Sequence, residues 1–167
     1  FVFSNTPINR FRLKNNNIST NFNKTKLLFD LKDQINSIEN CNIKKNSQKM
    51  VFGDGDINSQ IMLIGEAPGM LEESSGRTFQ GEVGDLLKKM MSAINISKDK
   101  IYFTYSINFR PPEDRKPTTQ EIKRYSFLLK RHISIINPKI LILMGSTAME
   151  AVTGSKNKIS TERGNWK

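Results

Sequence analysis

The 167-residue chain contains little of several residue types, and each shortage excludes a class of site. Cys41 is the one cysteine, so no disulfide can form within the chain, and a reducing compartment is indicated. One cysteine and one histidine, His132, are too few to make a metal site. No apolar run approaches the ~20 residues that a membrane-spanning helix needs. Cys41 is therefore expected to be a small, buried hydrophobic residue.

Acidic residues are scarce at the start of the chain. The first 50 residues contain nine Lys or Arg, eleven Asn and three Asp or Glu, and no acid precedes Asp30. Such a segment has little to bury, so we expect residues 1–25 to be a disordered, basic, Asn-rich extension and residues 26–167 to form the domain. An acid-free start also resembles an organelle transit peptide. We expect a cytoplasmic protein of bacterial type, with organelle targeting as the alternative.

The whole chain is strongly basic, with a formal net charge of +10 and a pI near 9.8. This excess indicates a polyanionic partner, nucleic acid first. The alternative is an ordinary domain from an organism whose codons favour Lys and Asn. Charge alone does not choose between the two.

Apolar patterning predicts strands that alternate with helices, and hence a single α/β domain around a parallel sheet. A capping box of Thr118 and Glu121 is expected at the start of one helix, and Ser146 is expected to cap another that ends at Gly154. The helix expected over residues 84–96 should carry one apolar face, made of Leu86, Leu87, Met90, Met91 and Ile94. The expected strands are 61–65, 101–109 and 139–145, and the expected helices are 25–38, 84–96, 118–138 and 146–154.

Three loops leave the carboxyl ends of these strands, where parallel sheets bind their ligands. They are 65–81, 109–117 and 145–147. The first reads "GEAPGMLEESSGRTFQG" and gathers carboxylates and one aromatic, Phe79. The second, "FRPPEDRKP", is rich in cations. The sequence therefore predicts a cleft with acids and an aromatic ring at its centre and cations at its rim.

Three kinds of site could occupy this cleft. A dinucleotide or phosphate site is disfavoured, because the G-x-G-x-x-G and Walker patterns are absent and Glu66 would repel phosphate. An enzyme that acts on DNA bases fits better, since it stacks a flipped base on an aromatic ring and holds the flanking phosphates with cations. The third alternative is a nucleic-acid-binding module that has the pocket without the chemistry.

Four blocks of the sequence resemble the type-4 uracil-DNA glycosylases. They are "IMLIGEAPGMLEESSGRTFQGEVGDLL", "IYFTYSINFRPPEDRKPTTQEI", "INPKILILMGSTAMEAV" and "ISTERGNW", and they occur in the family's order. The resemblance implies a three-layer α/β/α sandwich with a short parallel sheet. It also implies hydrolysis of the N-glycosidic bond of uracil in DNA, the first step of base excision repair. The alternative is a degenerate, DNA-binding relative with little or no excision, or one that reads another base.

The resemblance also implies roles for individual residues. Glu66 is the expected catalytic carboxylate that positions water, with Glu73 as a second candidate. No catalytic metal is expected. The expected partner is uracil-containing DNA, and no interaction with a membrane is expected. The protein is expected to be a monomer. The expected base pocket consists of Gly65, Ala67, Pro68, Gly69, Phe79 and Tyr105, and the expected DNA contacts are Arg110, Arg115, Lys116 and Ser146.

The chain departs from the family at its iron–sulfur ligands. The family holds a [4Fe–4S] cluster on four cysteines, whose positions correspond here to Ile38, Cys41, Phe109 and Tyr125. One thiolate cannot hold such a cluster, and the large apolar replacements are of a kind that fills the vacated volume. We therefore predict no cofactor, with Cys41 packed in the core.

Further departures affect the base pocket. The family reads the uracil edge with an Asn where this chain has Tyr105, while Asn108 should lie on the opposite face of the strand. Tyr105 could fill the pocket, change the base that is read, stack with Phe79, or simply pack on the sheet. Thr78 and Asp114 replace a Pro and an Asn of the family.

The family also continues beyond "RGNWK" into a final strand and a His-Pro loop. The chain is expected to be a fragment that lacks them, or a protein without that part of the machinery. The single histidine, His132, is expected to have a structural role on its helix.

Overall fold

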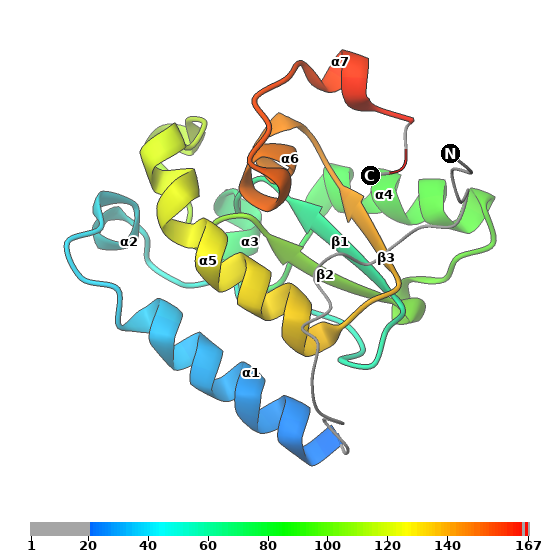
Figure 1. Cartoon of the computed structure of the whole chain (residues 1–167), viewed down its shortest axis with the longest axis horizontal. Coiled ribbons are helices and arrows are strands. Elements are labelled where there is room, and N and C mark those ends of the chain that lie inside the picture. The colour runs from blue at the N-terminus through cyan, green and yellow to red at the C-terminus, as the bar shows by residue number, and fades with distance from the viewer. Residues whose placement is uncertain (1–20, 165, 167) are drawn as a thin grey trace, which may run out of the picture.

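The computed structural model describes residues 21–164 and residue 166 (Figure 1). Its centre is a three-stranded parallel sheet of order β2-β1-β3. The strands are β1 (Ile61–Gly65), β2 (Ile101–Tyr105) and β3 (Ile140–Leu143). Because all three run in the same direction, their carboxyl ends meet at one edge, where Gly65 lies in register with Tyr105.

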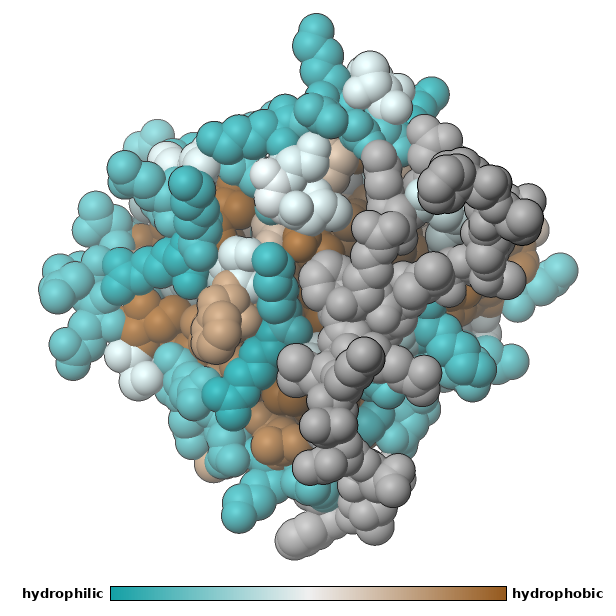
Figure 2. Space-filling view, viewed as in Figure 1, coloured by the Kyte–Doolittle hydropathy of each residue, from teal (hydrophilic) through white to brown (hydrophobic). Residues whose placement is uncertain are grey.

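Helices cover both faces of the sheet, which confirms the predicted three-layer α/β/α architecture. In Figure 1, α1 (Asn21–Asn36), α5 (Thr119–Ile136) and α6 (Ser146–Thr153) lie in front of the sheet, and α4 (Gly81–Ala93) lies behind it. Hydrophilic side chains dominate the front surface in Figure 2. The remaining short helices are α2 (Asn42–Asn46), α3 (Met70–Ser75), α7 (Ile159–Glu162), η1 (Lys98–Lys100) and η2 (Pro112–Asp114).

Side chains of each strand alternate between two hydrophobic cores, as the period of two in a strand requires. Met62, Ile64 and Tyr102 face the core under α1, α5 and α6. Leu63, Phe103 and other residues of the opposite parity face the core under α4. The second core also contains Phe79 and Tyr105, so the candidate base pocket belongs to the α4 side of the sheet.

Several element ends differ from the sequence expectations; helix α4, for example, covers residues 81–93 where 84–96 was expected, and β3 covers 140–143 where 139–145 was expected. Helix α1 begins at Asn21, so residues 21–25 are helical, while residues 1–20 of the expected extension lie outside the described residues. The capping box of Thr118 and Glu121 is confirmed. The predicted Ser146 cap is wrong, because Gly145, with a φ of 93°, is the N-cap and Ser146 is the first helical residue. Gly154 ends that helix in the left-handed conformation, as predicted.

Strand β2 ends at Tyr105, four residues before the end of the predicted strand. Its partner β1 ends at Gly65, and the peptide N–H groups of Ser106 and Ile107 then donate to the carbonyls of Gly65 and Glu66 across the strand ends. Beyond that point the chain turns back toward the segment that precedes β1. Residues 106–109 are buried in this loop, and they do not extend the hydrogen-bonded ladder of β2.

The predicted apolar face of α4 is packed along one side only. Leu87 and Met91 are buried against the sheet, whereas Leu86, Met90 and Ile94 are at least half exposed. An amphipathic helix buries a single stripe, and in α4 this stripe consists of Gly84, Leu87 and Met91. Among the described residues, no helix is long and apolar enough to cross a membrane.

Candidate active site

The carboxyl ends of β1 and β3 are joined by a hydrogen bond between side chains. Glu66 follows β1 directly and is half-buried, and Thr147 lies in the first turn of α6. The Thr147 hydroxyl donates to Glu66 Oε2 over 2.6 Å, which holds the carboxylate at the sheet edge. The sequence placed Thr147 in the loop 145–147 at the end of the third predicted strand, but it gave Thr147 no role.

Two further acids, Glu72 and Asp54, bind the backbone of the first loop. Glu72 accepts hydrogen bonds from the peptide N–H groups of Gly69, at 3.0 Å, and Gln80, at 2.9 Å. Asp54 accepts from the amide of Thr78 and, at 2.9 Å, from its hydroxyl. These carboxylates hold the start of α3 and the segment on either side of Phe79. Thr78 thus gains a partner that a proline at its position would lack.

Phe79 lies in a constrained conformation. Its φ of 49° is in the left-handed region, which is uncommon for an aromatic residue and requires support from its surroundings. Gly84 provides part of that support, because a Cβ at this position would lie 1.9 Å from the carbonyl oxygen of Phe79. Helix α4 can therefore start directly against the Phe79 backbone only with glycine at residue 84.

Tyr105 covers the ring of Phe79. The two ring centroids are 5.0 Å apart with an interplanar angle of 32°, and the Tyr105 hydroxyl accepts a hydrogen bond of 2.9 Å from the Phe79 peptide N–H. Both rings close over Gly65, where an added Cβ would lie 2.8 Å from the Tyr105 ring and 2.9 Å from the Phe79 ring. Burial raises the pKa of the Tyr105 hydroxyl, so it is neutral at any physiological pH.

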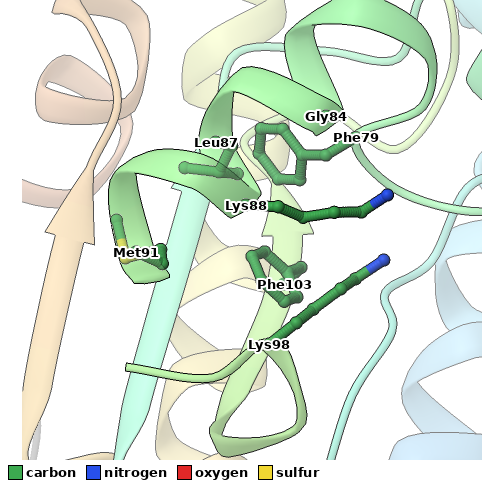
Figure 3. Close-up of a pocket in the computed structure, with 7 residues that line it drawn as sticks. All are labelled: Phe79, Gly84, Leu87, Lys88, Met91, Lys98 and Phe103. Carbon is green, nitrogen blue, oxygen red and sulfur yellow. The ribbon is translucent and has the colours of Figure 1, made fainter. Parts of the chain in front are cut away.

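A hollow beside Phe79 has residues of α4 as one of its walls (Figure 3). Lys88 and Lys98 extend in the same direction past the Phe79 and Phe103 rings that form part of its lining. Neither Glu66 nor Tyr105 lines it. Phe79 is the residue shared by this hollow and the contact with Gly65 and Tyr105.

Glu73, the second predicted catalytic carboxylate, is buried in the packing of α3. Its Oε1 accepts from the Ser47 hydroxyl, at 2.6 Å, and the Gln48 amide, at 2.8 Å, while Arg110 lies 3.4 Å from its Oε2. Burial opposes ionisation, but these hydrogen bonds together outweigh it and hold the pKa of Glu73 below its ordinary value. Glu73 thus ties α3 to two neighbouring segments.

Two of the predicted DNA-contacting cations are paired within the loop. Arg110 forms a bidentate ion pair with Asp114, at 2.6 and 2.7 Å, and Arg115 forms another with Glu121, at 2.9 and 2.7 Å. The hydrogen bond from Arg115 lowers the pKa of Glu121 to about 2. Lys116 is exposed and has no ion pair within the described part of the chain.

The other predicted pocket residues lie along the same loop. Pro68 is buried, and Ala67 packs against the core under α5. Gly69 caps α3, and Ser146 is exposed at the start of α6. The structure therefore brings Gly65, Phe79 and Tyr105 into contact, while Ser146 and Lys116 lie in separate segments that follow β3 and β2.

Comparison with known proteins agrees with this arrangement. The sequence profile described as the Uracil DNA glycosylase superfamily matches residues 52–167. The chain belongs to this superfamily. The uracil-DNA glycosylase resemblance of the four sequence blocks is thereby confirmed at the level of the superfamily.

Several relatives in the superfamily are type-4 uracil-DNA glycosylases. The protein of Thermotoga maritima is 30% identical over 145 residues, covering 86% of this chain and 76% of that protein. The protein of Archaeoglobus fulgidus is 31% identical over 125 residues, covering 75% and 63%. That of Sulfurisphaera tokodaii is 36% identical over 116 residues, covering 69% and 53%. The chain thus spans between about half and three quarters of the length of these relatives.

The four positions that the resemblance assigns to cluster ligands, Ile38, Cys41, Phe109 and Tyr125, all belong to or pack against the core on the α5 side. Cys41 Sγ lies 3.4 Å from the Tyr125 hydroxyl, and the Phe109 ring packs edge-on against Tyr125 with centroids 6.5 Å apart. Ile38 packs against the same core. One thiol, one phenol and two apolar side chains do not make a ligand set for four irons, and among the described residues no group of three metal-binding side chains occurs.

Two further polar residues, His132 and Asn108, have structural roles. The role of His132 was expected, whereas the expectation that Asn108 lies on the opposite face of the strand is wrong, because β2 ends at Tyr105. His132 is fully buried, stacks on Phe52 at 4.5 Å and shares a hydrogen bond of 2.9 Å with the Tyr102 hydroxyl. Burial lowers the pKa of His132 to about 3, so the ring is neutral in the folded protein. The amide of Asn108 donates to the carbonyls of Val51 and Phe52.

Proposed function

We propose that this chain is a uracil-DNA glycosylase domain that hydrolyses the N-glycosidic bond of uracil in DNA, the first step of base excision repair. The observation that carries the proposal is the Glu66–Thr147 hydrogen bond of 2.6 Å beside the Gly65 backbone and the Phe79 ring. It supports a fixed carboxylate at the position where parallel sheets bind ligands. Superfamily membership supports the same substrate class.

In the proposed reaction Glu66 orients a water molecule toward C1′ of the flipped nucleotide. The water oxygen bonds to C1′ and gives up a proton to the carboxylate, while the C1′–N1 bond breaks and its electron pair leaves with uracil. A carboxylate also stabilises the oxocarbenium-like sugar that develops along this path. Thr147 fixes one oxygen of Glu66 and leaves the other for the water. We assign Thr147 as a positioning residue.

The other predicted residues take different proposed roles. The backbone of 65–69 and the Phe79 ring shape the base pocket. Lys116 and Ser146, both exposed, contact DNA phosphates. Arg110 and Arg115 brace the loop that carries Lys116, since their guanidinium groups are paired internally. Glu73 has a positioning role in the packing of α3.

We further propose that the domain folds without an iron–sulfur cluster. The support is the packing of Tyr125 and Phe109 around Cys41, which occupies the volume that a cluster needs. Iron analysis of protein purified without oxygen tests this directly. We expect no iron above background, and about four irons per chain with brown absorbance would contradict it. The monomeric state and the cytoplasmic location remain predictions.

One experiment tests the proposed activity. A uracil-containing oligonucleotide is incubated with the protein and treated with alkali, which cleaves the abasic sites that excision leaves. We expect Glu66→Gln to lower the excision rate about 10²- to 10⁴-fold. The matched control is Glu82→Gln, which changes an exposed carboxylate in the first turn of α4 and should leave the rate unchanged. An active protein that Glu66→Gln does not affect would exclude the proposed site.

A degenerate, DNA-binding relative is the second candidate function. The observation that favours it is the burial of the Phe79 ring under Tyr105, which leaves the Phe79 side chain 9% exposed. This candidate predicts binding of the oligonucleotide without abasic product, in the wild type and in Glu66→Gln alike.

A further inference from the structure

The volume between Gly65 and Phe79 is occupied by the ring of Tyr105. The ring lies at the last position of β2, directly across the ladder from Gly65. It is within 2.8 Å of the place where a Cβ of Gly65 would be, and its own side chain is 4% exposed. A planar molecule cannot stack on this face of Phe79 while the Tyr105 ring is there.

Tyr105 also makes a specific polar contact with the backbone of Phe79. Its hydroxyl oxygen accepts a hydrogen bond from the Phe79 peptide N–H over 2.9 Å, in a buried position. A buried peptide donor needs an acceptor, because losing its partner leaves it desolvated and unpaired. The left-handed backbone at Phe79 aims this donor into the space beside Gly65. Any molecule that replaces the Tyr105 ring therefore has to supply an acceptor oxygen at the same place.

The phenol ring of Tyr105 thus has the outline of a pyrimidine base. Both are planar six-membered rings, and both carry an exocyclic oxygen that accepts a hydrogen bond in the ring plane. A purine has a second fused ring and exceeds the volume that a phenol vacates. A pyrimidine with a ring carbonyl could both stack on Phe79 and accept from its peptide N–H.

We propose that Tyr105 is an internal surrogate for the flipped base, and that it determines whether a base enters the site and which class of base fits. This inference rests on the proposed function of the Gly65–Phe79 edge as a base pocket. In the resting protein the surrogate closes the site. A pyrimidine enters only when the Tyr105 side chain leaves, and the hydrogen bond to Phe79 then passes from the phenol to the base.

Truncation of the ring tests this proposal. We expect Tyr105→Ala to bind free uracil, seen as a rise in the melting temperature and as heat in titration calorimetry, and the wild type to bind it at least tenfold more weakly. Adenine is the size control and should bind neither protein. Phenol should also stabilise Tyr105→Ala but not the wild type. Equal uracil affinity in the two proteins, or equal binding of adenine and uracil by the variant, would overturn the proposal.

A second comparison does not depend on how the alanine variant folds. Tyr105→Phe keeps the ring and removes the acceptor oxygen, so it should still exclude uracil. The wild type itself should bind an oligonucleotide with an abasic analogue at least as tightly as one with uracil, because the abasic site does not require the ring to leave. Tighter binding of the uracil strand by the wild type would contradict the surrogate role.

The uracil-binding and uracil-excision measurements together distinguish an error in the Tyr105 proposal from an error in the proposed glycosylase activity. If Tyr105→Ala binds uracil but neither it nor the wild type releases uracil from DNA, the surrogate is supported and the activity is not. If the wild type excises uracil at a rate that Glu66→Gln abolishes, yet binds free uracil as well as Tyr105→Ala does, the activity is supported and the surrogate is overturned.

Discussion

Tyr125 and Tyr105 are two buried tyrosines with different surroundings. The Tyr125 ring lies beside Cys41, and the Tyr105 ring lies beside Phe79. Tyr125 belongs to α5 and faces the core that also includes α1 and α6, where Cys41 and Phe109 contact it. Tyr105 lies at a strand end, under a loop whose backbone is constrained at Phe79. Both rings belong to hydrophobic cores, but in our proposal the Tyr105 ring is the one that leaves its core to admit a base, whereas the Tyr125 ring stays in place.

The largest expected effect is the loss of the Tyr125 ring. Tyr125 is 1% exposed and packs against several elements, so Tyr125→Ala should lower the free energy of unfolding by about 3–5 kcal/mol. Urea unfolding measures this. Tyr125→Phe, the matched control, removes only the hydroxyl contact with Cys41 and should cost about 1 kcal/mol.

A smaller effect is expected at Tyr105, which would distinguish the two rings quantitatively. Tyr105→Ala should cost about 2–3 kcal/mol, because water can reach the vacated space at the sheet edge and solvate the Phe79 peptide N–H. The same urea experiment gives the value. A loss as large as that of Tyr125→Ala would remove the difference between the two tyrosines, since it would make Tyr105 an ordinary core residue.

Acid should affect the α5 side of the sheet through His132. Its pKa is about 3 when folded and about 6.5 when unfolded, so the unfolded state binds more protons below pH 6.5. Its contribution to stability is complete above pH 6.5 and is lost as the pH falls toward 3. Between pH 7 and pH 5 the loss should be about 2 kcal/mol. In His132→Gln the stability should change less over this range, and an unchanged slope would contradict the assignment.

The smallest effect concerns Glu73, which links the two regions. It binds Ser47 and Gln48, which follow the Cys41 segment, and Arg110, which follows Phe109. Glu73→Ala should cost about 1–2 kcal/mol through these lost hydrogen bonds. Glu82→Ala, on the exposed side of α4, is the control and should change stability by less than about 0.5 kcal/mol. Equal effects of the two variants would show that Glu73 is not a link.

Local sequence patterns predicted a helix or strand correctly where the residue pattern and the burial of the segment in the folded protein favour the same structure. Strand β1 has the predicted bounds, because a continuous apolar run ended by glycine suits a strand covered on both faces. The Thr118 cap was equally predictable from its Glu121 partner. The end of β2 was not, because residues 106–109 (Ser-Ile-Asn-Phe) are buried in a loop yet alternate polar and apolar side chains as a strand does.

The site was predictable in position but not in its contacts. The resemblance located Glu66, Phe79 and Tyr105, yet the choice among the roles of Tyr105 depends on where its ring packs. Nor does the sequence show which of the nearby carboxylates, Glu113, Asp114 and Glu121, pairs with Arg110 or Arg115. That choice depends on the conformation of the irregular loop, which spacing alone does not specify.

The most direct test of the closed base pocket is a crystal structure of Tyr105→Ala with uracil bound. We predict a uracil ring stacked on Phe79 above Gly65, with a carbonyl oxygen close to the 2.9 Å that separates the Tyr105 hydroxyl from the Phe79 nitrogen in the wild type. Uracil bound elsewhere, or a loop that has collapsed into the vacated space and leaves no site, would contradict the assignment of this edge as a base pocket closed by its own tyrosine.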